Sequence, residues 1–174
     1  MDGINLNILG RSGALSADDP ARGQEEPGLA VIMMMLHGEA LAIPLSQVKE
    51  IIRVPHITWV PGAPASVKGI INLRGTVVAV LELAALLGHP AVECGQTSRI
   101  VIVDSAGAVA GLLVEEVLGV EEVAYAAIEP SMRTLDEQQR GYISAQAEAA
   151  GRLVGILDID AILGNSRPAE NFNR

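Results

Sequence analysis

Residues that could catalyse a reaction or hold a metal are few in this chain of 174 residues. The sequence has three His, which are His37, His56 and His89, and a single Cys, Cys94. No His has a second His or Cys at the spacing of metal ligands. The patterns GxSxG, GxxxxGK(S/T) and GxGxxG do not occur, which argues against a nucleophile elbow and a phosphate-binding loop. We therefore predict no metal site and no cofactor.

Paired carboxylates occur at 115–116 and 121–122 and as Asp158 with Asp160. General acid/base catalysis needs two carboxylates that converge on one cleft. Neighbours in a strand point to opposite faces, so the two Glu-Glu pairs cannot converge locally. Asp158 and Asp160 stand where a helix is expected to begin, and capping explains them better than catalysis does. The sequence therefore predicts no catalytic residues and no enzymatic activity.

The segment Asn72-Leu73-Arg74-Gly75 lies between two aliphatic runs and predicts a tight turn. Gly75 suits a positive φ, and the Asn72 side chain can bond the backbone of its own loop. Such a turn would present Arg74 as an isolated cation on an acidic protein, a typical anchor for the carboxylate of a partner. The alternative is an ordinary solvated Arg.

A second candidate surface lies in the segment 43–52, where a one-turn segment leads into a strand. Alternation along that strand puts Val48 and Glu50 on the same face. An exposed Val48 beside Glu50 would form a small mixed patch for a helical partner. The alternative is a buried Val48 with a solvated Glu50.

The elements that must position these residues are mostly strands. Short runs of Val, Ile and Leu, each closed by Gly, Pro, Asn or Asp, indicate an all-β fold. Loops with a Gly at 37–39 and 105–107 favour hairpins. Short helices are expected at 82–87 and 158–163, each ended by a Gly. The predicted strands are 29–36, 40–43, 48–53, 67–72, 76–81, 99–104, 109–114, 117–123, 141–147 and 152–157.

The two halves of the chain repeat each other. GTVVAVLELAALLG at 75–88 aligns without a gap with GRLVGILDIDAILG at 151–164. Earlier blocks, 43–51 with 112–120 and 69–72 with 141–144, align in the same order. Two copies with about five strands each favour two small β-barrels related by duplication and packed as one unit.

Composition excludes several classes of function. A net charge of −9 repels polyphosphate, so nucleic acid is an unexpected partner. The longest apolar run is far shorter than the ~18 residues of a membrane helix, so we expect no direct membrane insertion. The N-terminus lacks a secretory signal, and one Cys fits a reducing compartment, so the expected location is cytoplasmic. We predict a disordered extension over 1–28 and a flexible tail over 165–174.

Four segments resemble the CheW family of chemotaxis coupling proteins. They are LHGEALAIPLSQVKEII at 36–52, ITWVPGAPASVKGIINLRGTVVAVLEL at 57–83, RIVIVDSAGAVAGLLVEEVLGV at 99–120 and GYISAQAEAAGRLVGILDIDAIL at 141–163. The NLRG segment, preceded by VPGAP and VKG, is specific to such domains. The resemblance covers about 29–164, with a first barrel at about 29–95 and a second at about 96–164, between which strands may be exchanged.

The resemblance implies two five-stranded SH3-like barrels around a hydrophobic interface and no enzymatic activity. It implies an adaptor between the cytoplasmic tips of methyl-accepting chemotaxis receptors and the regulatory domain of a CheA-type histidine kinase, held at membrane-associated receptor arrays through its partners. The alternative is a CheW-like regulator of a paralogous, pilus or developmental, chemosensory system. A CheV-like protein would add a receiver domain and a CheA an ATP-binding domain, and we expect neither in this chain.

The resemblance also assigns partner-binding residues one by one. Val48, Glu50, Gly69 and Arg74 match positions that the family uses for receptor or kinase coupling, and Val120 stands in the corresponding motif of the second half. Asn72 completes the predicted set through its turn. The sequence departs from the family at Glu82, where Asp is usual, and because Glu caps a helix less well than Asp, the helix there is expected to start less sharply.

Overall fold

The computed structural model describes residues 26–130 and 135–165. The predicted extension and tail lie outside these residues, apart from 26–28 and 165. The strands are β1 (Gly28–Leu36), β2 (Glu39–Pro44), β3 (Val48–Arg53), β4 (Val67–Leu73), β5 (Thr76–Glu82), β6 (Arg99–Ser105), β7 (Ala108–Val114), β8 (Glu116–Ala124), β9 (Glu129–Pro130), β10 (Ile143–Ala149) and β11 (Arg152–Leu157). The helices are α1 (Leu83–Leu86) and α2 (Ile159–Asn165), with one-turn 3₁₀ segments η1 (Leu45–Gln47), η2 (Tyr125–Ala127) and η3 (Gln139–Gly141).

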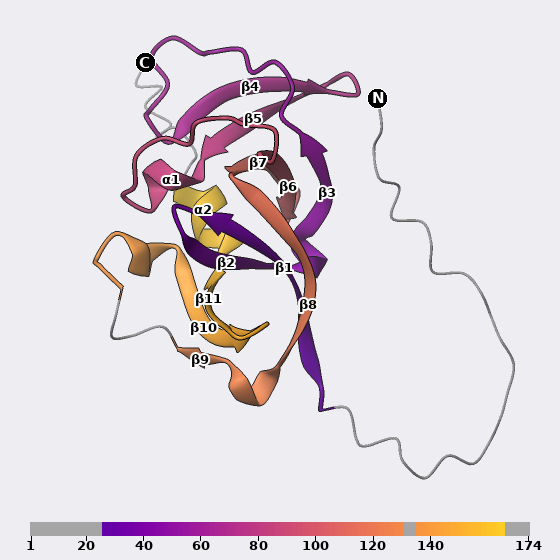
Figure 1. Ribbon diagram of the computed structural model, residues 1–174. Helices are drawn as coiled ribbons and strands as arrows, with labels where there is room; N and C mark the ends of the chain where they lie inside the picture. Colours follow the sequence, from indigo (N-terminus) through magenta and orange to yellow (C-terminus); the bar gives the residue numbers. More distant parts are fainter. Residues whose placement is uncertain (1–25, 131–134, 166–174) are drawn as a thin grey trace, which may run out of the picture.

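The described strands form two sheets, which confirms the predicted all-β class. One sheet has six strands in the order β8-β1-β2-β11-β10-β9, and the other has five in the order β3-β6-β7-β5-β4. In Figure 1 the five-stranded sheet lies above the six-stranded one, with α2 between them. All ten predicted strands are present. The strand expected at 141–147 begins only at Ile143, because Gln139–Gly141 forms a 3₁₀ turn, and the two-residue β9 was not predicted.

The duplication is visible in the topology, and each sheet takes strands from both halves. The hairpin β1-β2 joins β8, β10 and β11, whereas the hairpin β6-β7 joins β3, β4 and β5. Each exchanged hairpin is attached by a parallel contact, β2 with β11 and β7 with β5. Position by position, β8-β1-β2-β11-β10 therefore corresponds to β3-β6-β7-β5-β4. Neither sheet can form from one half alone.

One sequence alignment between the halves was wrong, because its register differs from that of the paired strands. Gly69 was aligned with Gly141, but Gly141 lies in η3 and outside the sheet. In β4 a bulge separates Val67 from Gly69, and in β10 the same bulge separates Ile143 from Ala145. Gly69 therefore corresponds to Ala145. The identical Gly was misleading because strand pairing, not letter identity, sets the correspondence.

The larger of two core clusters is aliphatic and is shared by the two sheets. It joins Leu36 and Leu41 of the six-stranded sheet to Leu81 and Leu113 of the five-stranded sheet and to Ile162 of α2. The smaller cluster, which includes Val31 and Val154, is formed by buried residues of the six-stranded sheet alone. No aromatic side chain belongs to the fully buried core of the described residues. Aromatic residues make up 2% of the chain, and Val, Ile, Leu, Met and Ala supply the core instead.

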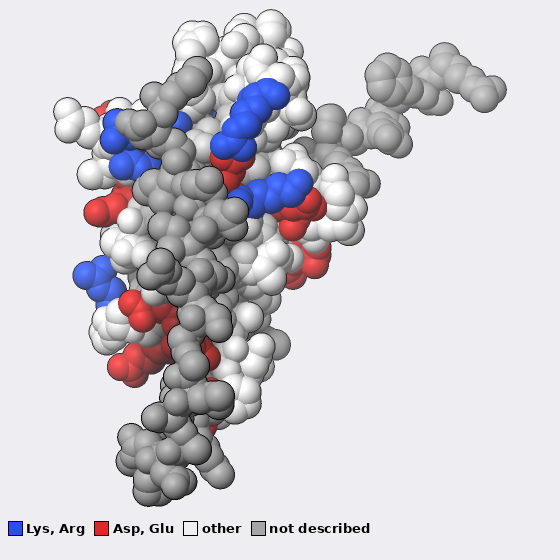
Figure 2. All heavy atoms as spheres, turned by 90° about the vertical axis from the view of Figure 1, so that its right-hand side faces the viewer, with Lys and Arg blue, Asp and Glu red and all other residues white. Residues whose placement is uncertain are grey.

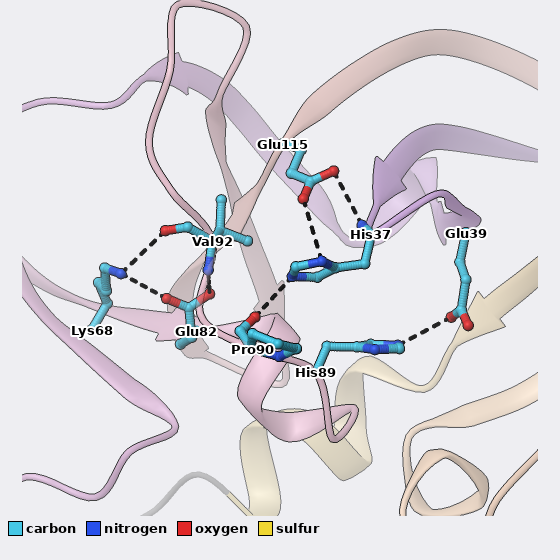
Figure 3. Close-up of polar contacts among 8 residues, drawn as sticks. All are labelled: His37, Glu39, Lys68, Glu82, His89, Pro90, Val92 and Glu115. Atoms are coloured by element: carbon cyan, nitrogen blue, oxygen red, sulfur yellow. Dashed lines mark hydrogen bonds and ion pairs between the residues drawn. The ribbon is translucent and has the colours of Figure 1, made fainter.

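Each half ends in a short helix, and the two helices start differently. The Asp158 carboxylate accepts a hydrogen bond from the Ala161 N–H at 2.9 Å and so caps α2, as predicted. Glu82 occupies the corresponding place before α1 but makes no capping hydrogen bond, and α1 has only four residues. The Glu82 carboxylate instead accepts hydrogen bonds from Lys68 Nζ at 2.8 Å and from the Val92 N–H at 3.1 Å (Figure 3). It thereby fastens the connection between the halves to β4 and β5.

A second group of polar contacts joins the sheets close to this connection. The His37 N–H, in the turn between β1 and β2, donates to Glu115 Oε2 at 3.1 Å. The His37 ring lies 2.8 Å from the Pro90 carbonyl and stacks on the His89 ring at a centroid distance of 5.3 Å (Figure 3). These two His therefore link the turn between β1 and β2 to the connection between the halves. Among the described helices, none is long and apolar enough to cross a membrane.

The pair of Lys68 and Glu82 gives a stability prediction. Glu82 is 2% exposed, so replacing Lys68 by Met leaves a carboxylate buried without its countercharge. Removing one partner of a buried pair destabilises strongly, and we expect the free energy of unfolding of Lys68→Met to fall by about 3 kcal/mol in urea denaturation. Adding Glu82→Leu to this variant should recover part of the loss. A Lys68→Met protein as stable as the wild type would contradict this account of the pair.

Candidate partner-binding site

The most defined polar feature of the five-stranded sheet is an ion pair between Glu50 and Arg74. Arg74 Nη1 donates to Glu50 Oε1 at 2.9 Å, and Nη2 donates to Oε2 at 2.8 Å. Glu50 lies on β3 and Arg74 on the turn between β4 and β5, and β3 and β4 are the two edge strands of this sheet. The ion pair therefore links β3 to the turn between β4 and β5.

The local sequence explains how the turn presents Arg74. Arg74 has φ 51° and Gly75 has φ 87°, a two-residue hairpin turn with both central residues in the left-handed region. The Gly75 N–H donates to Asn72 Oδ1 at 2.7 Å, which is the loop contact predicted for Asn72. Asn72 therefore stabilises the turn from within. A non-glycine residue in this conformation costs about 1 kcal/mol, which the hydrogen bond and the ion pair help to offset.

The ion pair orients the guanidinium without covering it. The Arg74 side chain remains 73% exposed, whereas that of Glu50 is 22% exposed. A guanidinium has five N–H donors, and Glu50 takes two of them. Three donors therefore remain for a partner. The isolated cation expected from the sequence is in fact a paired one with a fixed direction.

Around the ion pair lies a shallow pocket of about 300 Å³. Its walls combine the charged Lys49, Glu50 and Arg74 with the aliphatic Val77 and Val109, which are 66% and 37% exposed. Lys49, Val77 and Val109 were missed by the sequence analysis. The signal available in the sequence was Val77, an outward position of a strand next to the Arg74 turn. The pocket therefore combines the Glu50–Arg74 ion pair, which we call the charged fork, with exposed aliphatic side chains.

Lys49 forms a second ion pair close by, with Asp104 at 2.8 Å. The hydrogen bond from Lys49, together with the Gly107 N–H that donates to Asp104 Oδ1 at 3.0 Å, lowers the pKa of Asp104 below its usual 3.8. Figure 2 shows basic side chains of the upper part of this face lying next to acidic ones. Charged residues on this surface therefore occur as ion pairs of opposite sign and not as a patch of one sign.

Val48 occupies neither of its two predicted environments fully. It is half-buried and packs against the shared core. Val48 pairs with Val103 and Glu50 with Ile102, so Lys49 is an extra bulged residue on β3. The bulge breaks the alternation that was expected to place Val48 and Glu50 on one face. Val48 packs against the core, while Glu50 lines the pocket.

Gly69 is buried on β4, where it admits another segment of backbone. A Cβ built at position 69 would lie 2.3 Å from the Thr58 carbonyl oxygen and 2.7 Å from Ile57 Cγ2. Its φ of 154° adds to the restriction. Any side chain here must displace the segment around Thr58. Gly69 is therefore a positioning residue.

Val120 lies apart from the other predicted site residues. It is on β8 of the six-stranded sheet, opposite Ile32, and is 54% exposed. The strand correspondence puts Gly119 at the place of Glu50, because Gly119 faces Met33 as Glu50 faces Ile102. Ala150 stands in the turn that corresponds to that of Arg74. The six-stranded sheet therefore lacks this ion pair, and one sheet alone carries the charged fork.

The described part of this site combines two ion pairs with exposed Val side chains. Within the described residues no cluster of three His, Cys, Asp or Glu is placed to hold a metal ion.

A family model described as "CheW-like domain" matches residues 30–167, most of the chain. The chain belongs to the CheW family.

Individual CheW relatives cover most of both chains. The chain is 32% identical to the "Chemotaxis protein CheW" of Bacillus subtilis over 136 residues, which are 78% of this chain and 87% of the relative. It is 24% identical over 165 residues to "Protein PilI" of Pseudomonas aeruginosa, covering 88% and 93%. The crystal structure of the scaffolding protein TtCheW from Thermoanaerobacter tengcongensis superimposes with a TM-score of 0.69 at 28% identity, covering 76% and 90%.

The contact between Lys49 and Asp104 gives a prediction for the candidate site. Replacing Lys49 by Met removes the main cause of the lowered pKa, because Met has no hydrogen-bond donor, so the pKa of Asp104 should rise toward 3.8 while the Gly107 bond keeps it from rising fully. A ¹³C NMR titration of the Asp104 carboxyl measures this. A lowered pKa stabilises the fold above the unfolded pKa, and this contribution is lost as the pH falls through the folded pKa. The Lys49→Met protein should therefore lose less stability in acid than the wild type. An unchanged titration would refute this assignment.

Proposed function

We propose that this CheW-like protein is a non-enzymatic adaptor that couples methyl-accepting chemotaxis receptors to a CheA-type histidine kinase. The observation that carries the proposal is the exposed Arg74 guanidinium, held by Glu50 over a pocket with an aliphatic wall. Arg with three unused donors suits a carboxylate of a protein partner, and exposed Val77 supplies apolar area next to it. Both are features of a binding surface.

The coupling mechanism needs no bond chemistry. An adaptor that contacts receptor and kinase changes the kinase's conformational equilibrium by the difference in its binding free energy between the two kinase states. A preoriented guanidinium makes that difference sensitive to small shifts in partner geometry, since bidentate contacts require a narrow range of angles. The protein would reach membrane-associated arrays through its partners.

A second candidate is the same coupling role in a paralogous chemosensory system with a pilus or developmental output. The relatives with other names support it, namely "Protein PilI" and "Protein FrzA" of Myxococcus xanthus, the latter 26% identical over 128 residues and covering 73% of this chain. The two candidates share the site and differ in the receptors and kinase that occupy it. Reconstitution with the receptor and kinase pairs of the source organism would separate them, since only the cognate pair should be coupled.

Charge reversal at the turn tests the adaptor directly. Arg74→Glu places a carboxylate against Glu50 and removes the cation, so receptor-dependent kinase stimulation should fall at least tenfold. The fold should remain, because changes to exposed charges alter stability by only about 1 kcal/mol or less. The measurement is kinase phosphorylation with reconstituted receptor and kinase. Arg152→Glu, next to the corresponding turn of the other sheet, is the matched control and should stimulate like the wild type.

The double variant Glu50→Arg/Arg74→Glu separates a binding role from a folding role. It can restore an ion pair between β3 and the turn that follows β4. It presents a carboxylate, however, at the position where the partner would contact a guanidinium. We expect it to remain inactive although stably folded. Full stimulation by the double variant would show that the pair acts only through the fold, and normal stimulation by Arg74→Glu alone would remove Arg74 from the site.

A further inference from the structure

Strand β8 lies at the edge of the six-stranded sheet. It has nine residues, and within the described residues it pairs with β1 alone (Figure 1). An edge strand presents a row of unpaired backbone N–H and C=O groups, and proteins usually cover such an edge, shorten it or charge it. β8 is longer than the other described edge strands β3, β4 and β9. It therefore offers the longest open row to a further strand.

The side chains of β8 continue an apolar face of the sheet to this open edge. Val117 faces Met34 and Val120 faces Ile32 across β1. Directly opposed residues share a face, so Val117 and Val120 lie on the face that carries these two core side chains. Ile32 and Met34 are buried, whereas Val120 is 54% exposed. Leu118, the extra residue of the bulge, is 42% exposed. A strand added to this edge would cover apolar area.

Carboxylates flank the apolar part of β8. Glu116 precedes it, Glu121 and Glu122 follow it, and all three are exposed. A second copy of the chain, paired with this edge about a two-fold axis, would bring Glu116 close to the copy's equivalents of the other two. Like charges opposite one another destabilise a strand pair. The edge therefore suits an apolar strand that carries no acidic residue and has a basic residue close by.

One stretch of the chain outside the described residues has this chemistry. Residues 4–9, which we call the N-terminal segment, read INLNIL, with an apolar residue at every second position from Ile4 to Ile8. Such alternation predicts a strand with one apolar face. Arg11 is the only charged residue in 3–17. The N-terminal segment thus combines an apolar row with a neighbouring cation, which complements the apolar edge and the glutamates of β8.

The connection to β1 brings the N-terminal segment within reach of β8. Gly28 at the start of β1 faces Ala124 at the end of β8. The Tyr125 N–H donates to the Pro27 carbonyl at 3.2 Å, so the chain enters the sheet beside β8. Residues 10–27 can span roughly 60 Å when extended, and β8 is about 30 Å long. A tethered segment meets the edge at an effective concentration on the order of millimolar, which favours it over a separate chain.

We infer that the N-terminal segment adds to the open edge of β8 as a further strand of the same chain. Its apolar row lies over Val117 and Val120, and Arg11 lies near the glutamates of β8. While the segment is bound, no strand of another protein can pair with this edge, so the segment controls access to β8. The family match covers 30–167, so this strand is an addition to the CheW-like domain. The inference is independent of the proposed function, because β8 does not line the Arg74 pocket.

Hydrogen exchange of the full chain, followed by NMR, tests the inference. The β8 amides that point away from β1 should exchange at least tenfold more slowly in the wild type than in Leu6→Asn, because Leu6 is central to the apolar row. Leu9→Asn makes the same change outside that row and should keep the slow exchange. Equal exchange of these amides in the wild type and in Leu6→Asn overturns the inference.

Variants of the sheet give an independent test. Val120→Asn should speed the exchange of these amides as Leu6→Asn does, and combining the two changes should add little, since both release the same contact. Val77→Asn alters a Val that is 66% exposed on the other sheet and should leave the exchange of β8 unchanged. All these substitutions are at exposed positions of the sheets, so the variants should fold. Additive effects of Val120→Asn and Leu6→Asn would contradict a direct contact.

Protein concentration separates the same chain from a second copy. Exchange slowed by a tethered segment does not depend on concentration, and the wild-type chain should sediment as a monomer throughout the range used. A peptide of residues 1–11, added to the Leu6→Asn protein, should restore the slow exchange only at concentrations on the order of millimolar. Slow exchange that appears only as the wild-type chain dimerises overturns the assignment to the same chain.

Discussion

The structure depends on an aliphatic core that neither half of the chain can enclose alone. Each half sends its first hairpin into the sheet of the other, so β1-β2 completes one sheet and β6-β7 completes the other. Most of the buried Leu, Ile and Val side chains of both sheets then form one cluster, and a smaller cluster lies within the six-stranded sheet. Because unfolding either sheet removes strands from the other, the position of every surface residue, including those of the candidate site, is set by both halves together.

The two sheets correspond strand by strand but differ at the positions of the candidate site. Two sheets with the same strand order could carry two equal sites, but only the five-stranded sheet has Glu50 and Arg74, and the corresponding positions of its counterpart are Gly119 and Ala150. The two sheets therefore present different polar surfaces, because the Glu50–Arg74 ion pair lies on one of them and has no counterpart at Gly119 and Ala150 of the other.

Local sequence predicted the strands, the hairpin turns and the Asp158 cap because those depend on neighbouring residues, whereas Asp160 lies inside α2 and accepts a hydrogen bond from Ser105. The Asn72 contact with Gly75 and the Asp158 cap follow from side chains within three positions of their partners. The ion pair was not predicted as a pair, although Glu50 and Arg74 were each named, because their contact depends on how the sheet curls. The β3 bulge at Lys49 and the register that equates Gly69 with Ala145 likewise arise from strand pairing, which no local pattern encodes.

The central claim is that Arg74, oriented by Glu50, makes direct contact with a partner. The most direct measurement is the NMR signal of the Arg74 Nε–H, recorded for the full chain alone and after addition of the cognate kinase regulatory domain or receptor tip. The account predicts that one of these partners shifts the signal and slows its exchange with water, because a carboxylate takes up the free donors. An Arg74 signal that stays unchanged while both partners are bound would contradict it.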